Sequence, residues 1–194
     1  MNLYQNQYRT KSIRLPNRDY TQNGWYFVTI CTYKKINYFG DIINTKMQRS
    51  PIGDIAQQYW VEIPQHHQNI FIDTFIIMPN HIHGIIIIEN PKSRCRDVAG
   101  NVSTQTMIND EYNLPKVMSQ ISPKAGSLST IIRSYKSAVT RWCGQNKYNN
   151  FAWQPRFYDH IIRNDGSLER IREYIINNPI KWEEDKNNPI NLWI

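Results

Sequence analysis

The chain has 194 residues, 40% of them hydrophobic, with twelve Tyr and six Trp, which is enough for one domain with a buried core. Its formal charge of +7 is concentrated in residues 1–50 and 101–150. Basic segments rich in aromatic residues favour a nucleic-acid partner, although ordinary surface charge gives the same count. The three cysteines form no Cys-x-x-Cys pair, which excludes a zinc ribbon, and no apolar run is long enough to span a membrane.

The first part of the chain predicts an arm, then strands and a helix. Residues 1–24 are polar and basic without the apolar core of a signal peptide, so we expect a basic arm on an intracellular protein. Trp25–Thr32 predicts a strand from its β-branched and aromatic content, and Tyr38–Ile43 predicts a weaker one. The apolar spacing in Ile52–Ile63 is that of a helix.

Two isoleucine-rich runs, Phe71–Met78 and His81–Ile88, predict a β-hairpin because Pro79-Asn80 between them is a turn signal. His81 and His83 then point to the same face of one strand, about 6–7 Å apart along it. Two neutral imidazoles on one face can bind a single metal ion. An isolated His-x-His pair is equally consistent with two edge histidines that bind none.

The second half of the chain begins with a change in composition. Residues 90–126 are rich in Ser, Thr, Asn, Pro and Lys without any period, which predicts a loop insertion. A helix with one apolar face is expected to begin at Ser127. Trp153–Arg163 predicts an edge strand, because Pro155 cannot donate a hydrogen bond to a neighbouring strand.

The last helix is expected to have Ser167 as its cap and to end near Asn177. The order strand, helix, strand, strand, helix, strand, helix is that of the split βαβ plan. We therefore predict the α+β class, with a ferredoxin-like antiparallel sheet and helices on one face. This domain should occupy residues 25–182, and residues 183–194 should form a C-terminal tail.

The last helix carries Tyr174 and Asn178, which lie one above the other at positions i and i+4. If this helix packs across the strand that carries His81 and His83, an amide oxygen and a phenol reach the two imidazoles. A divalent ion held there could act on a phosphate as a Lewis acid, and the phenol could act as a covalent nucleophile. Taken alone, Tyr174 is more often a half-buried helix tyrosine without a chemical role.

Several sequence blocks resemble the single-tyrosine HUH transposases of bacterial insertion sequences, in particular the REP-associated tyrosine transposases. The resemblance runs from about residue 14 to residue 182, and residues 90–126 are its main departure. Several ordered blocks are far more specific than a His-x-His pair alone. The blocks are Tyr26–Thr32, Met78–Gly84, Ser134–Ser137, Trp153–His160 and Tyr174–Pro179.

The resemblance implies a Mg²⁺- or Mn²⁺-dependent endonuclease and strand transferase that acts on single-stranded DNA with hairpins. It implies a monomer or homodimer in the bacterial cytoplasm, associated with the nucleoid. By motif position, His81 and His83 are metal ligands, and Tyr174 is the nucleophile that forms a 5′-phosphotyrosine. Asn178 stands at the third-ligand position, where the insertion-sequence members carry the longer Gln.

Other interpretations stay open. A non-catalytic ferredoxin-like protein that binds structured nucleic acid is the main alternative, and a His-x-His metallohydrolase is a weaker one in a chain too short for a (β/α)₈ barrel. We expect Tyr135 to be a core residue, Tyr158 to stack on a base or on the core, and His160 to be an ordinary strand histidine. Each basic residue that could contact DNA is equally consistent with plain surface charge. These residues are Arg14, Arg18, Lys34, Lys35, Lys136, Arg156 and Arg163.

Overall fold

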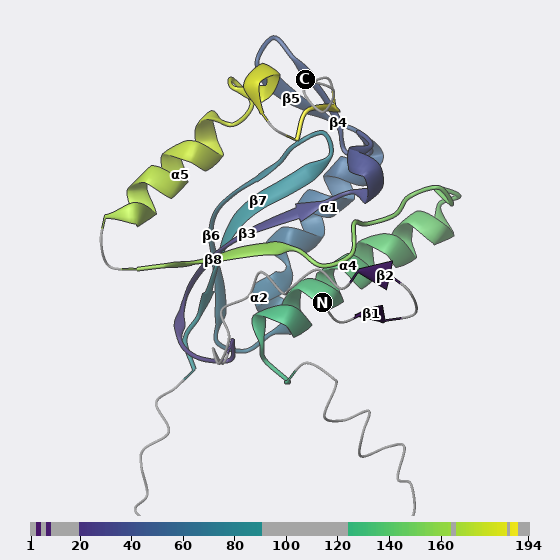
Figure 1. Ribbon diagram of the computed structural model, residues 1–194. Coiled ribbons are helices and arrows are strands. Elements are labelled where there is room, and N and C mark those ends of the chain that lie inside the picture. Colours follow the sequence, from purple (N-terminus) through teal and green to yellow (C-terminus); the bar gives the residue numbers. More distant parts are fainter. Residues whose placement is uncertain are drawn as a thin grey trace, which may run out of the picture.

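The centre of the structure is a four-stranded antiparallel sheet (Figure 1). The computed structural model describes residues 3–4, 7–8, 20–90, 124–163, 166–185 and 187–189. A long helix, followed by a short one, lies between the first two strands of the sheet in the chain, and another lies before its last strand. This is the ferredoxin-like split βαβ plan, so the predicted fold class is confirmed. In spatial order the strands are β6 (Ile70–Ile77), β7 (His81–Ile88), β3 (Gly24–Cys31) and β8 (Tyr158–Ile162).

One face of the sheet is covered by α1 (Pro51–Val61) and α4 (Leu128–Gln145), which pack against each other over the main hydrophobic core. Ser50 and Ser127 cap these two helices, each accepting a hydrogen bond from the backbone of the first turn. On β7 every second residue faces the two helices, including Ile82 and Ile86. These residues make up the larger of the two buried clusters.

The opposite face carries α5 (Ser167–Asn177), which contacts the outer strand β6 (Figure 1). A smaller hydrophobic cluster lies beneath it, in which Ile175 of α5 meets Ile85 and Ile87 of β7. Helices α1 and α4 therefore lie together on one face as predicted, whereas α5 lies over the other. His81 and His83 alternate with Ile82 along β7, so they point to the α5 face.

Three boundaries differ from the predictions. The helix predicted over Ile52–Ile63 ends at Val61, and a short helix α2 (Ile63–His66) follows because Pro64 cannot continue the first one. The weak strand predicted over Tyr38–Ile43 is β4 (Gly40–Ile43). It pairs with β5 (Lys46–Arg49), which was not predicted, in a separate hairpin turned by Asn44 and Thr45.

The third difference concerns the predicted strand Trp153–Arg163, of which only Tyr158–Ile162 is a strand. Trp153 forms a single bridge to Thr32, and the chain between is interrupted where Arg156 has a positive φ of 67°. Nor does Ser167 cap α5. Gly166 stands at the cap position with φ 75°, and the Ser167 hydroxyl donates to the Arg163 carbonyl.

Parts of two predicted segments lie outside the described residues. Of the basic arm 1–24, the structure describes the short antiparallel pair β1 (Leu3–Tyr4) and β2 (Gln7–Tyr8) and the residues from Tyr20 onward. Arg14, Arg18 and most of the predicted insertion 90–126 are not described. Within the described ranges, no helix has the length and apolar character that crossing a lipid bilayer requires.

Candidate functional site

His81 and His83 converge on the α5 face of the sheet, and both are buried. Their Nε2 atoms lie 3.0 Å apart, and the two rings meet edge to face with centroids 4.5 Å apart. Two nitrogen ligands at about 2.1 Å from one octahedral ion, at right angles to each other, are separated by about 3.0 Å. The separation of the two nitrogens therefore fits neighbouring positions around one metal ion.

Asn80 fixes the orientation of His81. Its side-chain Nδ2 donates to the backbone carbonyls of Lys35 at 2.9 Å and Asn187 at 2.8 Å, which identifies the other amide atom as the oxygen. That Oδ1 lies 2.9 Å from His81 Nδ1 and can only accept, so Nδ1 carries the proton. The lone pair of neutral His81 is therefore on Nε2, the atom that faces His83.

His83 is held by a hydroxyl and by aromatic rings. Its Nδ1 lies 2.9 Å from the Thr29 hydroxyl oxygen on the neighbouring strand β3. Its ring stacks on Phe27, with centroids 5.4 Å apart, while the ring of Trp182 stacks on His81 at 6.0 Å. Trp182 begins the 3₁₀ turn η2 (Trp182–Glu184), so the C-terminal segment forms one wall of the site.

Helix α5 brings Tyr174 to this pair. Its phenol oxygen lies 3.2 Å from His83 Nε2, and its ring meets the His83 ring edge to face. The side chain is 42% exposed, so the phenol can be reached from solvent. Partial burial, followed by the negative charge of Asp185, raises the pKa of the Tyr174 phenol, and a hydrogen bond from Asn178 acts in the opposite direction. The phenol is therefore protonated near neutral pH.

An ion pair fastens α5 to the sheet. Arg172 donates from Nε to Asp73 Oδ1 at 2.9 Å and from Nη2 to Asp73 Oδ2 at 2.7 Å, a bidentate geometry. Asp73 can face α5 because the pairing of β6 with β7 shifts register between Ile72 and Phe75. The Arg172 guanidinium lowers the pKa of Asp73 to about 2. Arg172 precedes Tyr174 by two residues on α5, so this ion pair anchors the helix close to the phenol.

Asn178 follows the last turn of α5 and is 3% exposed. Among the described residues, its side-chain Oδ1 is a buried atom without a hydrogen-bond partner. Leaving a buried amide oxygen without a partner costs about 1–3 kcal/mol. An oxygen in this situation is a suitable ligand for a divalent ion.

Asp185 is a fourth candidate ligand, which the sequence analysis missed. Its carboxylate is buried, its Oδ2 lies 3.9 Å from His81 Nε2, and the ligand atoms of His81, His83 and Asp185 all lie within 4.8 Å of one another. A buried carboxylate beside two imidazoles is a donor set that a divalent ion can take. The only signal in the sequence was the acidic run Glu183-Glu184-Asp185, which has no fixed spacing from the histidine motif.

Of the seven basic residues predicted to contact DNA, Arg14 and Arg18 lie outside the described residues, and the other five lie in different parts of the fold. Lys34 and Lys35 belong to the 3₁₀ turn η1 (Tyr33–Lys35), where the Lys35 carbonyl contacts Asn80, as described above, and the Lys34 ammonium lies over the Tyr33 ring. Lys136 lies on α4, on the other face of the sheet, and Arg156 precedes β8. Arg163 is exposed just after β8.

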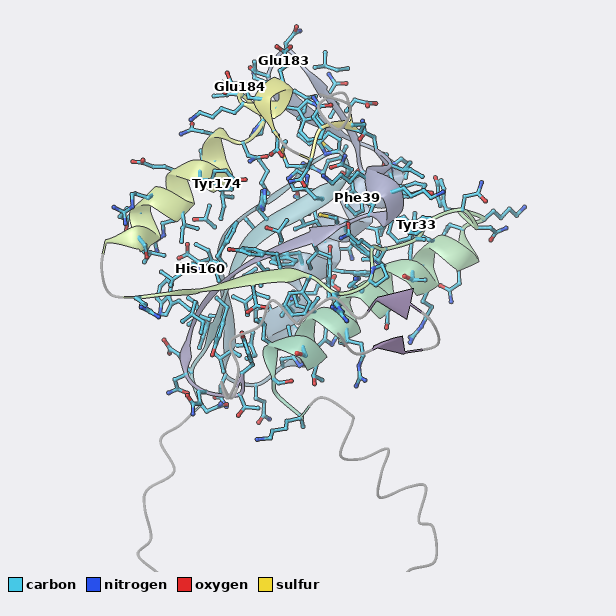
Figure 2. All side chains as sticks on the ribbon, in the orientation of Figure 1. Tyr33, Phe39, His160, Tyr174, Glu183 and Glu184 are labelled. Carbon is cyan, nitrogen blue, oxygen red and sulfur yellow. The ribbon has the colours of Figure 1, made fainter. Side chains whose placement is uncertain are left out.

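Three other candidate residues are also placed. Tyr135 is a core residue as predicted, buried with its hydroxyl donating to the Ala56 carbonyl. Tyr158 pairs with Thr29 across the strands, is exposed, and by alternation faces the same side as His83. His160 is exposed on the edge strand β8, and Figure 2 shows it there with Tyr174 on α5.

The chain is similar in sequence to proteins of Haemophilus influenzae. No family model matches the chain. An uncharacterized protein of Haemophilus influenzae is 40% identical over 181 residues, which cover 91% of each chain. A second protein of that organism, provisionally named a REP-associated tyrosine transposase, is 26% identical over 166 residues, 84% of this chain and 74% of that protein.

A solved structure extends the comparison to the fold. It is that of a REP-associated tyrosine transposase bound to a REP hairpin, and it matches with a TM-score of 0.52. The match covers 90% of this chain and 77% of that one, at 20% sequence identity. At this level of identity the match establishes a shared fold.

Proposed function

We propose that this chain, which belongs to one family with the uncharacterized Haemophilus influenzae protein, is a metal-dependent single-stranded DNA endonuclease and strand transferase of the transposase type. One observation carries the proposal: the phenol oxygen of Tyr174 lies 3.2 Å from an imidazole nitrogen of the converging histidine pair. The fold shared with a hairpin-bound transposase and the weaker likeness to a second named transposase support hairpin-containing DNA as the substrate.

In the proposed reaction the Tyr174 oxygen attacks a DNA phosphorus. A bond forms between the phenol oxygen and phosphorus, and the bond from phosphorus to the 3′ oxygen breaks. The phenol loses one proton and the departing 3′ oxygen gains one, so the step is balanced. The product is a 5′-phosphotyrosine and a free 3′-hydroxyl, and attack by another 3′-hydroxyl reverses the step and joins strands.

The proposed ligands of the divalent ion, Mg²⁺ or Mn²⁺, are His81, His83 and Asn178. The buried Asn178 oxygen without a partner supports its part in this set, although Asn is one methylene shorter than Gln. Asp185 is the competing third ligand, because its carboxylate already lies beside His81. When bound, a divalent ion supplies Lewis-acid polarisation of the phosphate.

The decisive test is Tyr174→Phe with single-stranded DNA taken from the flanks of the gene, in the presence of Mn²⁺. We expect the wild-type protein to form a covalent adduct, seen as an increase in intact mass equal to a DNA fragment, and the variant to form none. Tyr148→Phe is the matched control, because Tyr148 is similarly exposed, at 38%, and follows the end of α4 away from the histidines.

Two outcomes would contradict the proposal. Free cleaved ends that persist in Tyr174→Phe would identify a metallohydrolase that does not use the phenol. DNA binding without an adduct in any variant would favour the alternative, a non-catalytic ferredoxin-like nucleic-acid-binding protein.

A further inference from the structure

A basic groove lies on the far side of the sheet from Tyr174. It runs between the outer surface of α4 and the segment that leads into β8, and it has a volume of about 610 Å³. Four cationic side chains line it, three of them from α4. They are Arg133, Lys136, Arg141 and Arg156. Because α4 and α5 cover opposite faces of the sheet, this groove is separate from the histidine site.

Two of these cations, Arg133 and Arg141, have no acidic partner within the described part of the chain. Of the described residues that line the groove, none is Asp or Glu. These two arginines are eight residues apart, about 12 Å along the helix. Ser137 lies between them on the same side, so the groove presents a row of donors to an anionic ligand.

Lys136 has a structural part in the groove. Its Nζ donates to the carbonyls of Gln154 at 2.7 Å and Arg156 at 3.1 Å, and it lies 5.5 Å from the centre of the Trp153 ring. The Trp153 indole donates in return to the Lys136 carbonyl at 3.1 Å. These bonds tie the segment before β8 to α4. They hold Arg156 in its left-handed conformation, which a non-glycine residue keeps only where its surroundings fix it.

We propose that this groove binds the phosphate backbone of the paired stem of a DNA hairpin. Arg133, Arg141 and Arg156 contact the phosphates, and Lys136 positions Arg156. The inference depends on the proposed function for the identity of the nucleic acid, and it adds the place where the stem lies. Guanidinium groups are the side chains best suited to phosphate oxygens, which only accept hydrogen bonds.

The residues of the groove favour a duplex over a single strand as its ligand. Proteins that hold single strands stack bases on exposed aromatic rings, whereas the aromatic ring that lines this groove, Phe157, is half-buried in the core. The unpaired DNA has a short path to the active site around the edge strand β8. Tyr158, the next residue, is exposed and pairs with Thr29, whose hydroxyl contacts His83.

The test measures binding without chemistry, in a Tyr174→Phe background without metal. A fluorescently labelled, fully paired DNA hairpin is titrated at several salt concentrations with Arg133→Gln/Arg141→Gln. The control is Lys46→Gln/Arg170→Gln, which removes the same charge from exposed positions on β5 and α5. We expect the groove variant to bind the hairpin on the order of tenfold more weakly. The slope of log K against log salt should become less steep by about 2, while the control changes little in both measures.

An equal loss in both double variants would overturn the proposal, because net charge alone would then explain it. Tighter groove-dependent binding of an unpaired strand, or equal groove-dependent binding of an RNA hairpin, would also overturn the assignment to a DNA stem. The result is independent of nicking. If the groove variant loses hairpin binding but the wild-type protein never forms an adduct, the groove proposal stands and the proposed function fails. If the wild-type protein forms an adduct but the groove variant binds the hairpin normally, the proposed function stands and the groove proposal fails.

Discussion

The two faces of strand β7 are equally buried but differ in chemistry. Toward α1 and α4 the strand presents Ile82 and Ile86, which pack in the hydrophobic core, and Gly84, which leaves room for the Trp60 ring. Toward α5 it presents His81 and His83, whose ring nitrogens all have defined neighbours. Burial alone therefore does not locate the site. The difference lies in the two imidazoles of the α5 face, which are buried and oriented by hydrogen bonds.

Gly84→Ala should have the largest effect on stability. A Cβ at this position would lie 2.3 Å from Trp60 Cζ2 and 3.1 Å from Phe75 Cβ, so the core must shift. We expect a loss of about 3 kcal/mol in the free energy of unfolding, measured by urea denaturation. Combining the change with Trp60→Phe should cost less than the sum of the two, because the smaller ring relieves the clash.

Gly144→Ala is the control for this comparison. Gly144 lies in α4 with nothing near its missing Cβ, so alanine there should be neutral or stabilising by up to about 1 kcal/mol. If Gly84→Ala were as harmless as Gly144→Ala, the face of β7 toward α1 would not be tightly packed.

Asn80→Ala should have the next largest effect, on the other face. It removes the acceptor of His81 Nδ1 and the donor to the Lys35 and Asn187 carbonyls. We expect Mn²⁺ affinity to fall about 10–100-fold in calorimetry, the usual cost of losing a residue that orients a ligand. His66→Ala removes an exposed imidazole away from the site and should leave Mn²⁺ binding unchanged. Equal affinity in Asn80→Ala and wild type would contradict the proposed metal site.

Asp73→Asn tests the ion pair that holds α5, and its effect should depend on pH. The pKa of Asp73 is lowered to about 2, so its contribution to stability is fully present above about pH 4 and is lost as the pH falls toward 2. At pH 7 we expect a loss of about 1 kcal/mol after allowance for solvent screening. Urea denaturation at pH 7 and at pH 2.5 measures the change.

The pair Asp54–Arg49 is the matched control, because its carboxylate is largely exposed. Asp54→Asn should change stability by no more than about 0.5 kcal/mol at either pH. A cost of Asp73→Asn that stayed the same at low pH would mean that packing, and not charge, accounts for it.

Local patterns in the sequence were enough to predict the sheet. Isoleucine content and the Pro79-Asn80 turn gave β7 with its observed ends, and helical spacing gave α4 after Ser127. Local patterns failed where the determining feature is conformational. The left-handed Arg156 interrupts the strand predicted over Trp153–Arg163, and Gly166 takes the cap position expected for Ser167.

The site was predictable only in part, for a different physical reason. The approach of Tyr174 to His83 follows from placing one helix over one strand, and the motif pair indicated it. Asp185 reaches the histidines from the C-terminal turn, and Asp73 reaches α5 through the register shift in β6. The positions of both features depend on tertiary packing. No spacing rule within the sequence connects such residues to the motif.

Thr29→Val should have the smallest effect and shows how the two imidazoles differ. His81 is oriented by an amide that also fixes two backbone segments, whereas His83 has the Thr29 hydroxyl on one side and the Phe27 ring stacked against it. Valine keeps the volume of Thr29 and the stacked ring stays in place, so Mn²⁺ affinity should fall only about threefold to fivefold, below the usual cost for an orienting partner. If calorimetry gave a loss as large as that of Asn80→Ala, the hydroxyl and not the aromatic stack would position His83. The Thr29 hydroxyl would then matter as much for Mn²⁺ binding as the Asn80 amide does.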